Sequence, residues 1–355
     1  MLVFYVEIDT WLHPELERSQ LATDSSWDSA LHTLNNSYPD KKGPWRIEVS
    51  DSKRAMSARY YNPIETRCEG FAPLMVWLTN DGLSVLREDY WGHYLATWLY
   101  NLHYTLLFGE TGTFVIGYIG LAALFLLVSG LVSWWPKQGQ WPRAFKFKRR
   151  RTRIGLLYDW HKILGLASIV PLFLLVATGV MLSLPQETNK VLELLFSPVQ
   201  TASKLSGVAS TKIQHTVPIS DAITAARQAK VAENGANLQQ SRLAWIQTPD
   251  NNLSAQRFYT FRFQIPEDPS HRFPNTFVHV DADSGQIINI FSAWKHGPAN
   301  NIKGWLHTLH NGSVGGMTLR ILWVICGLIV LALFCLGFTR WRLRTGKKAP
   351  PALKM

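Results

Sequence analysis

Two stretches of the chain follow nearly the same pattern: Trp98-Leu99-Tyr100-Asn101-Leu102-His103 and Trp305-Leu306-His307-Thr308-Leu309-His310. Each stretch leads through glycine-containing sequence into a long apolar segment. The repeat therefore gives His103 and His310 equivalent places, each at the start of a predicted membrane helix. Two such histidines at one membrane face can hold a metal centre between two helices, and a haem iron with two axial imidazoles fits best.

Three segments are apolar over the roughly 20 residues that a helix needs to cross the hydrocarbon core of a bilayer. They are residues 113–135, 163–184 and 317–338. The remaining sequence is polar and mixed, which explains a mean hydropathy of −0.02 in a chain with 47% hydrophobic residues. The sequence thus predicts a membrane protein with three helical spans.

The net charge of +11 is concentrated at two places. Residues 137–153 hold eight basic residues and no acidic one, and the sequence from Arg340 to the end adds six more. These fourteen charges exceed the net charge, so the rest of the chain is slightly acidic. Basic residues beside membrane spans mark the cytoplasmic side. We therefore expect membrane lipid as a partner and no nucleic acid, with the larger polar segments in the periplasm of a bacterial inner membrane.

The beginning of the chain extends the repeat. With an offset of 180 residues, Met1-Leu2 aligns with Met181-Leu182 and Glu7 with Glu187. Met181 lies at the end of a predicted membrane helix. We therefore expect a matching helix before Met1, absent from this sequence through a truncated gene record or in a shortened variant. The three cysteines predict neither a disulfide framework nor a cysteine metal site.

The two outer segments show the same order of predicted elements. The second contains an amphipathic helix over 219–230, strands over 243–247 and 257–265, and a hairpin over 277–290. The first contains a helix over 27–34, strands over 45–49 and 55–61, and a hairpin turning at Asn80-Asp81-Gly82. The expected segments are an outer α+β domain (1–97), a membrane helix with His103 (98–136), a basic cytoplasmic loop (137–157), a membrane helix with His161 (158–184), a second outer domain (185–304), a membrane helix with His310 (305–341) and a basic tail (342–355).

Several common kinds of active site are not predicted. The sequence has no Gly-x-Gly-x-x-Gly after a strand, no phosphate-loop lysine and no His-Glu-x-x-His motif. A built-in flavin or nucleotide domain and a hydrolase site are therefore not expected. The chemistry would come from a cofactor that the protein positions.

The chain resembles the PepSY-associated transmembrane proteins, and within them the branch of inner-membrane ferric-siderophore reductases. The resemblance covers essentially the whole chain and rests on four motifs in order: Leu102-His103 with Gly112, Gly117 and Gly120; Ser129-Gly130-Leu131 with Trp134-Trp135-Pro136; Trp160-His161-Lys162 with Leu164-Gly165-Leu166, Pro171 and Thr178-Gly179; and Leu309-His310-Asn311-Gly312 with Arg320.

The resemblance implies a helical membrane bundle, with three transmembrane helices here and four in the family, and two duplicated periplasmic α+β PepSY-like domains. It also implies two b-type haems, one near each face of the membrane. His103 and His310 match the periplasmic ligand pair, and His161 matches a cytoplasmic-side ligand. The fourth ligand would lie on the missing first helix, so the resemblance implies a cytoplasmic haem that is either missing from this chain or bound by His161 alone.

Two further residues are candidates for the haem surroundings. Arg320, expected about three turns beyond His310, could hold a haem propionate or be an interfacial arginine reaching toward the lipid headgroups. His307 aligns with Tyr100 and is expected on the substrate side of the haem or beside a ligand. For His103, His310 and His161, the alternative is a structural histidine at the membrane interface.

Three functions are compatible with these features. The first is a haem-dependent reductase that passes electrons from a quinol or a cytoplasmic reductant to a periplasmic ferric siderophore, and the aromatic and arginine-bearing strand 257–262 could contact the chelate. The second is a haem electron-transfer subunit of another membrane oxidoreductase. The third is a PepSY binding or inhibitory module that is tethered to the membrane and carries no haem.

Overall fold

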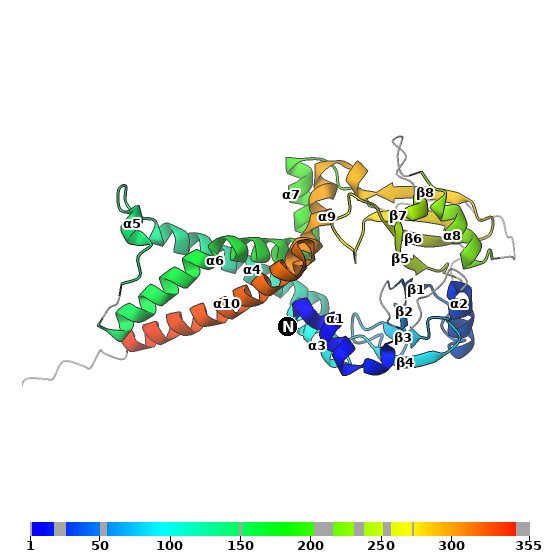
Figure 1. Ribbon diagram of the computed structural model, residues 1–355, viewed down its shortest axis with the longest axis horizontal. Helices are drawn as coiled ribbons and strands as arrows, with labels where there is room; N and C mark the ends of the chain where they lie inside the picture. Colours follow the sequence, from blue (N-terminus) through cyan, green and yellow to red (C-terminus); the bar gives the residue numbers. More distant parts are fainter. Residues whose placement is uncertain are drawn as a thin grey trace, which may run out of the picture. The chain divides into compact units, whose positions relative to one another are not determined.

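The computed structural model describes residues 2–17, 26–49, 55–148, 151–201, 216–230, 238–250, 257–271 and 273–345 (Figure 1). The chain forms two compact units. The helical unit contains Val115–Ser183 and Leu309 onward, and the sheet unit contains Leu2–Phe114 and Leu184–Thr308. Much of the expected basic tail, including Lys347, Lys348 and Lys354, lies outside the described residues, as do Arg149 and Arg150.

The sheet unit is built on one eight-stranded antiparallel sheet in the order β4-β3-β2-β1-β5-β6-β7-β8. The predicted strands and hairpins of both outer segments are confirmed. Their bounds are β1 Trp45–Glu48, β2 Met56–Tyr60, β3 Leu74–Leu78, β4 Val85–Tyr90, β5 Arg242–Gln247, β6 Phe258–Gln264, β7 Thr276–Asp281 and β8 Ile287–Ser292.

The two outer segments join where β1 pairs with β5, with Ile47 opposite Ile246. The two segments therefore share one sheet. The sequence predicts separate domains over 1–97 and 185–304, and this prediction does not include the shared sheet. In isolation, each four-stranded half would have two edges with unpaired backbone N–H and C=O groups, and the pairing of β1 with β5 removes one edge of each half.

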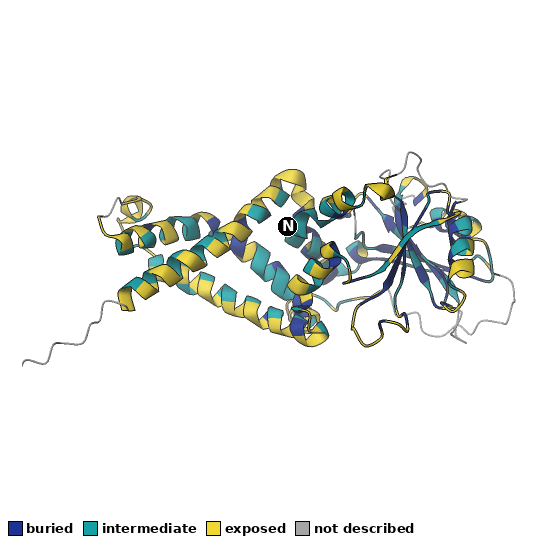
Figure 2. Cartoon of the chain, turned by 90° about the horizontal axis from the view of Figure 1, so that it is seen from below, coloured by how far each residue is buried: buried dark blue, intermediate teal, exposed yellow. Residues whose placement is uncertain are grey.

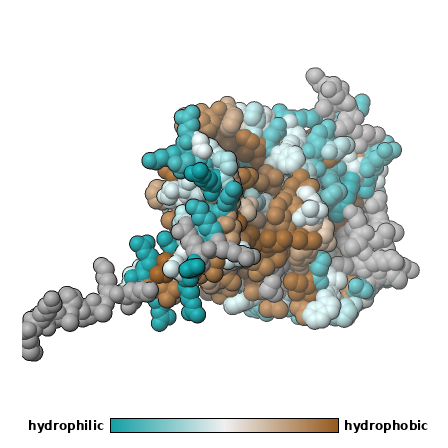
Figure 3. All heavy atoms as spheres, turned by 60° about the vertical axis from the view of Figure 1, so that its left-hand side comes forward, coloured by the Kyte–Doolittle hydropathy of each residue, from teal (hydrophilic) through white to brown (hydrophobic). Residues whose placement is uncertain are grey.

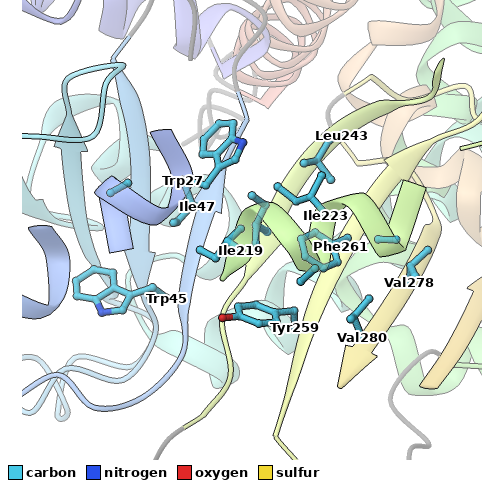
Figure 4. Close-up of a cluster of buried hydrophobic side chains, with 14 of the residues drawn as sticks. Trp27, Trp45, Ile47, Ile219, Ile223, Leu243, Tyr259, Phe261, Val278 and Val280 are labelled. Carbon is cyan, nitrogen blue, oxygen red and sulfur yellow. The ribbon is translucent and has the colours of Figure 1, made fainter. Parts of the chain in front are cut away.

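One face of the sheet carries the hydrophobic core of both halves (Figure 4). Helices α2 (Ser26–Ser37) and α8 (Ile219–Arg227) contribute Trp27, Ile219 and Ile223 to it. The carboxylate of Asp28 in α2 accepts hydrogen bonds from the backbone N–H groups of Ile219 and Ser220, at 2.6 and 3.1 Å. A cap of this kind is worth about 1 kcal/mol, and here it ties the first half to the second.

Further helices belong to the sheet unit: α1 Tyr5–Leu12, α3 Leu95–Thr105, α7 Pro185–Leu195 and α9 Gly297–Asn311. In the first half, α1 contacts α3. A second, smaller cluster of buried residues lies at the β3–β4 end of the sheet and contains Trp77 and Trp91, with Tyr94 and Tyr100 of the α3 region packed against it.

Three helices are long and apolar enough to cross a membrane: α4 Gly109–Trp134, α6 Arg153–Ser183 and the segment Ser313–Thr345 that contains α10 (Gly316–Thr345). These helices coincide with the three predicted spans: each begins earlier than predicted, and α4 and α6 each end one residue sooner. These helices remain largely exposed in the isolated chain (Figure 2), and the space-filling view shows a broad hydrophobic area beside hydrophilic groups (Figure 3). A surface of this kind is suited to contact with lipid.

Within the helical unit, α6 packs against α10. The contact of α6 with α4 is close at Gly120, where an added Cβ atom would lie 2.5 Å from a side-chain methyl of Val180. A short helix, α5 (Trp141–Ala144), lies between α4 and α6 in the chain. Small residues at such crossings allow membrane helices to approach one another closely.

Both histidine-bearing segments are interrupted, whereas the sequence predicts one helix over 98–136 and another over 305–341. The first breaks between α3 and α4, where Leu106 and Leu107 have φ of 51° and 63°. The second breaks at Gly312, with φ of 76°. His103 and His310 therefore lie in the last turn of a short helix that precedes each span, rather than in the span itself.

We expect Gly112→Ala to destabilise the chain by at least about 2 kcal/mol, because an added methyl would overlap the carbonyl oxygen of Thr105 at the first break. The midpoint of thermal unfolding in detergent, followed by tryptophan fluorescence, measures the effect. Gly130→Ala in α4 is the matched control, since no atom lies within 4 Å of its added Cβ. Equal midpoints for the two variants would contradict the close contact between Gly112 and Thr105.

Candidate functional site

His310 is held against helix α6 by its Nδ1 atom. Nδ1 lies 3.1 Å from the carbonyl oxygen of Leu175 and 3.2 Å from Oγ1 of Thr178. A carbonyl oxygen can only accept, so the proton of the neutral imidazole is on Nδ1 and its lone pair is on Nε2. Histidines that bind a metal through one ring nitrogen usually donate the other N–H in this way. The contact therefore fixes the orientation of the His310 ring and leaves Nε2 as the nitrogen that would bind a metal.

Gly179 makes room for this ring. A Cβ atom added there would lie 2.9 Å from Cε1 and 3.4 Å from Nδ1 of His310. The first distance is shorter than a normal carbon–carbon contact, so any larger residue would displace the imidazole. Thr178 and Gly179 thus form a cradle for His310, and both belong to the motif on which the family resemblance rests.

The turn after His310 is fixed by Trp323 of α10. Its indole N–H donates to the carbonyl oxygen of Leu309 at 2.8 Å, and the side chain is buried. This bond satisfies one of the carbonyl groups that a helix end leaves unpaired. The last turn of α9, which carries His310, is thereby attached to the membrane helix that follows it.

Arg320 lies differently from the sequence expectation. Because the helix breaks at Gly312, Arg320 is in the first part of α10 instead of three turns along one continuous helix. A Cβ atom added at Gly312 would be 3.3 Å from the Arg320 backbone. Arg320 is therefore near the end of α9 that carries His310, and its role toward a propionate stays a prediction.

His161 repeats the arrangement of His310 at another point of the helical unit. Its Nδ1 lies 3.2 Å from the carbonyl oxygen of Leu333 in α10. Cε1 passes 3.7 Å from the position of a Cβ added at Gly337. As with His310, the carbonyl partner places the proton on Nδ1, which leaves the Nε2 lone pair for a metal.

His103 and His307 both belong to the sheet unit. His103 is exposed and lies two residues before the end of α3. The ring of His307 in α9 stacks on Phe273, with centroids 4.3 Å apart and planes at 22°. Tyr100, the residue equivalent to His307 in the first repeat, packs edge-to-face on Trp91 at 5.4 Å. The two equivalent residues therefore each pack on an aromatic ring within the sheet unit, one stacked and one edge-to-face.

The structure divides the predicted site residues between its two units, and within the helical unit Arg320 lies near the end of α9 that carries His310. His310, Arg320 and His161 are in the helical unit, whereas His103 and His307 are in the sheet unit. The pairing of His103 with His310 around one iron therefore stays a prediction. Within the described residues, no group of three or more His, Cys, Asp or Glu side chains could hold a metal ion. Haem needs only two protein ligands, so this finding does not bear on it.

A family model described as the PepSY-associated TM region matches residues 1–344. The chain belongs to this family. The match spans both repeats and all three membrane helices, as the motifs of the sequence predict. No curated protein matches the chain.

The described residues of this chain are suited to bind a haem group. His310 and His161 each have Nδ1 bonded to a carbonyl oxygen, and Gly179 provides the space in which His310 turns. Neutral imidazoles in fixed orientation are the usual axial ligands of b-type haem, and small residues let a planar macrocycle approach a helix. This arrangement could hold a one-electron carrier such as haem.

The cradle predicts a specific coupling between Gly179 and His310. Gly179→Ala should lower the free energy of unfolding by about 1–3 kcal/mol, because the methyl overpacks the ring. In a His310→Ala background the same change should cost little. Thermal unfolding of the two single variants and the double variant measures the coupling. Gly327→Ala in α10, with no atom within 4 Å of the added Cβ, is the control. Additive effects would show that Gly179 does not accommodate His310.

Proposed function

We propose that this chain is a b-type haem protein of the bacterial inner membrane that reduces periplasmic ferric siderophores and so releases Fe(II) for uptake. The observation that carries the proposal is the oriented histidine at the end of the second repeat: His310, with Nδ1 on the Leu175 carbonyl and its ring in the Gly179 cradle. The equivalent place of His103 in the first repeat supplies the second ligand.

The proposed orientation of the chain in the membrane follows from the charged residues at the ends of the spans. The sequence between α4 and α6 is basic, and α10 ends with Arg340, Arg342 and Arg344. By the positive-inside rule these ends are cytoplasmic. The opposite ends of α4 and α10 then face the periplasm together with the last turns of α3 and α9, which carry His103 and His310.

Haem would supply a carrier for one electron at a time, which is what conversion of Fe(III) to Fe(II) requires. Fe(II) binds the hard oxygen donors of siderophores more weakly than Fe(III), so reduction releases the metal. The role of the protein is to hold the imidazoles in a fixed orientation at the ends of the short helices that precede the spans. Because the reaction only moves an electron, no residue has to transfer a proton.

His161 is the candidate ligand for a second haem on the cytoplasmic side. Its Nδ1 contact with the Leu333 carbonyl matches the contact of His310, and it lies near the beginning of α6, close to the basic loop. A haem at this position would receive electrons from a quinol or a cytoplasmic reductant.

The ligand assignment predicts the spectra of single variants. The purified wild-type chain should show a reduced-minus-oxidised spectrum of b type, and His103→Ala and His310→Ala should each lose the signal of the periplasmic haem, because one axial ligand is removed. Pyridine haemochrome analysis gives the haem content per chain. His32→Ala is the matched control, since His32 is exposed in α2 of the sheet unit.

Two results would reject this assignment. A wild-type chain without haem would leave a tethered binding module as the function. A haem that survives both His103→Ala and His310→Ala would place the ligands elsewhere. A chain that contains haem and fails to reduce any ferric chelate would instead be an electron-transfer subunit.

A further inference from the structure

The second face of the sheet, opposite the hydrophobic core, is lined by arginine and aromatic side chains. The strand register places the following residues in one row across all eight strands: Arg87, Trp77, Ser57, Glu48, Trp245, Arg262, Phe277 and Phe291. The neighbouring row contains Arg59 directly opposite Arg46.

Three of these residues form an arginine cluster, which we define as Arg46, Arg59 and Arg262. Arg46 and Arg262 lie on the ring of Trp245, with Cζ 4.6 and 5.6 Å from its centroid. Arg59 lies over Trp91 at 5.0 Å. Cation–π contacts of this kind favour a cation in a poorly hydrated place. They do not neutralise its charge.

The positive charge of the cluster is only partly balanced. Oε1 of Glu48 is 3.4 Å from Nη2 of Arg46 and 3.4 Å from Nη2 of Arg59, so these two guanidinium groups share it. Arg262 donates to the carbonyl oxygen of Pro274 and to Oδ1 of Asn275, both uncharged. The carboxylate of Asp268 also acts on Arg262 through its charge. Like charges that face one another across strands are destabilising.

Burial raises the free-energy cost of placing these positive charges close together. Burial, followed by the charge of Arg46, lowers the pKa of Arg262 to about 9. Arg59 is more than nine-tenths buried. Among the described residues, the Nε–H groups of Arg46 and Arg59 are buried without a hydrogen-bond acceptor. Buried donors of this kind are normally satisfied, so the cluster keeps donors that its partners within the described residues do not use.

The cluster is connected to both histidine-bearing helices. Phe273 lies beneath Arg262, 6.0 Å from Cζ, and stacks on His307, which precedes His310 by three residues in α9. Trp91 lies beneath Arg59 and packs on Tyr100, which precedes His103 by three residues in α3. An anion at the cluster would therefore contact a layer of aromatic rings that reaches the helices of the proposed haem ligands.

We propose that the arginine cluster binds the substrate of the reductase, and that this substrate is a negatively charged ferric chelate with aromatic catecholate donors. The inference rests on the proposed function for the identity of the ligand. Guanidinium groups supply paired donors to the anionic oxygens. Tyr61 and the exposed Phe71, whose ring centroids are 6.2 Å apart, offer rings against which catecholate rings can pack. Tyr61 OH accepts a hydrogen bond from Nη1 of Arg46 at 2.8 Å, so these rings lie beside the cluster.

The test uses a probe that cannot be reduced. The tris-catecholate complex of gallium(III) carries three negative charges and does not accept an electron under these conditions, so its binding is measured independently of reductase activity. Isothermal titration of the full-length chain in detergent should show binding of this complex and much weaker binding of the uncharged gallium tris-hydroxamate. Affinity for the anionic complex should fall with added salt, as expected for a charged contact.

Variants of the cluster should change the affinity in opposite directions. Arg46→Gln should weaken binding of the tris-catecholate complex at least about tenfold, because it removes a charge-assisted donor. Glu48→Gln should strengthen binding several-fold, because it removes the carboxylate that competes with the ligand. Arg227→Gln is the matched control: Arg227 lies over Phe263 of the core face, at 5.9 Å. A purely structural role would make both cluster variants weaker binders.

The inference and the proposed function can fail separately. Equal affinities for the two gallium complexes, no measurable binding, or weaker binding by Glu48→Gln would overturn the inference while leaving the haem spectrum and reductase assay unaffected. Binding as predicted by a chain that contains no haem would overturn the proposed function alone. If Arg46→Gln loses its native thermal unfolding transition, the Glu48→Gln variant and the salt dependence of the wild type decide the question.

Discussion

The pairing of β1 with β5 is the contact on which the sheet unit depends. It joins two four-stranded halves that are far apart in the sequence, and it places Ile47 beside Ile246 in the core. The same pairing brings Glu48 opposite Trp245 on the other face, so the arginines of the first half meet the aromatic residues of the second. Without this junction there would be two small sheets with exposed edges and no arginine cluster.

The helix breaks have a comparable role for the histidines. Without the break, α9 and α10 would form one continuous helix through His310. The break at Gly312 instead leaves His310 at a helix end, attached by Trp323 to the next helix and oriented by the Leu175 carbonyl. The position of the His310 ring therefore depends on backbone atoms and on the space left by Gly179. Few substitutions could provide the same arrangement.

The sequence predicted the strands, the turns and the three spans, because these depend on local periodicity. It did not predict the break at Leu106 and Leu107, since leucine favours helix and rarely adopts positive φ. The sequence also did not predict the contact of His310 with Leu175, because Leu175 contributes only a backbone carbonyl. The arginine cluster could not be predicted either: its members lie on strands about 200 residues apart and meet only through the sheet register.

The most direct test of electron transfer is to mix the anaerobically reduced chain with a ferric tris-catecholate chelate and to follow the haem α-band by stopped flow. The account predicts that the band decays to that of the oxidised protein while one Fe(II) appears per haem oxidised, captured by a ferrous-specific chromogenic chelator. A band that persists in the presence of excess ferric chelate, with no Fe(II) formed, would contradict the proposed reductase.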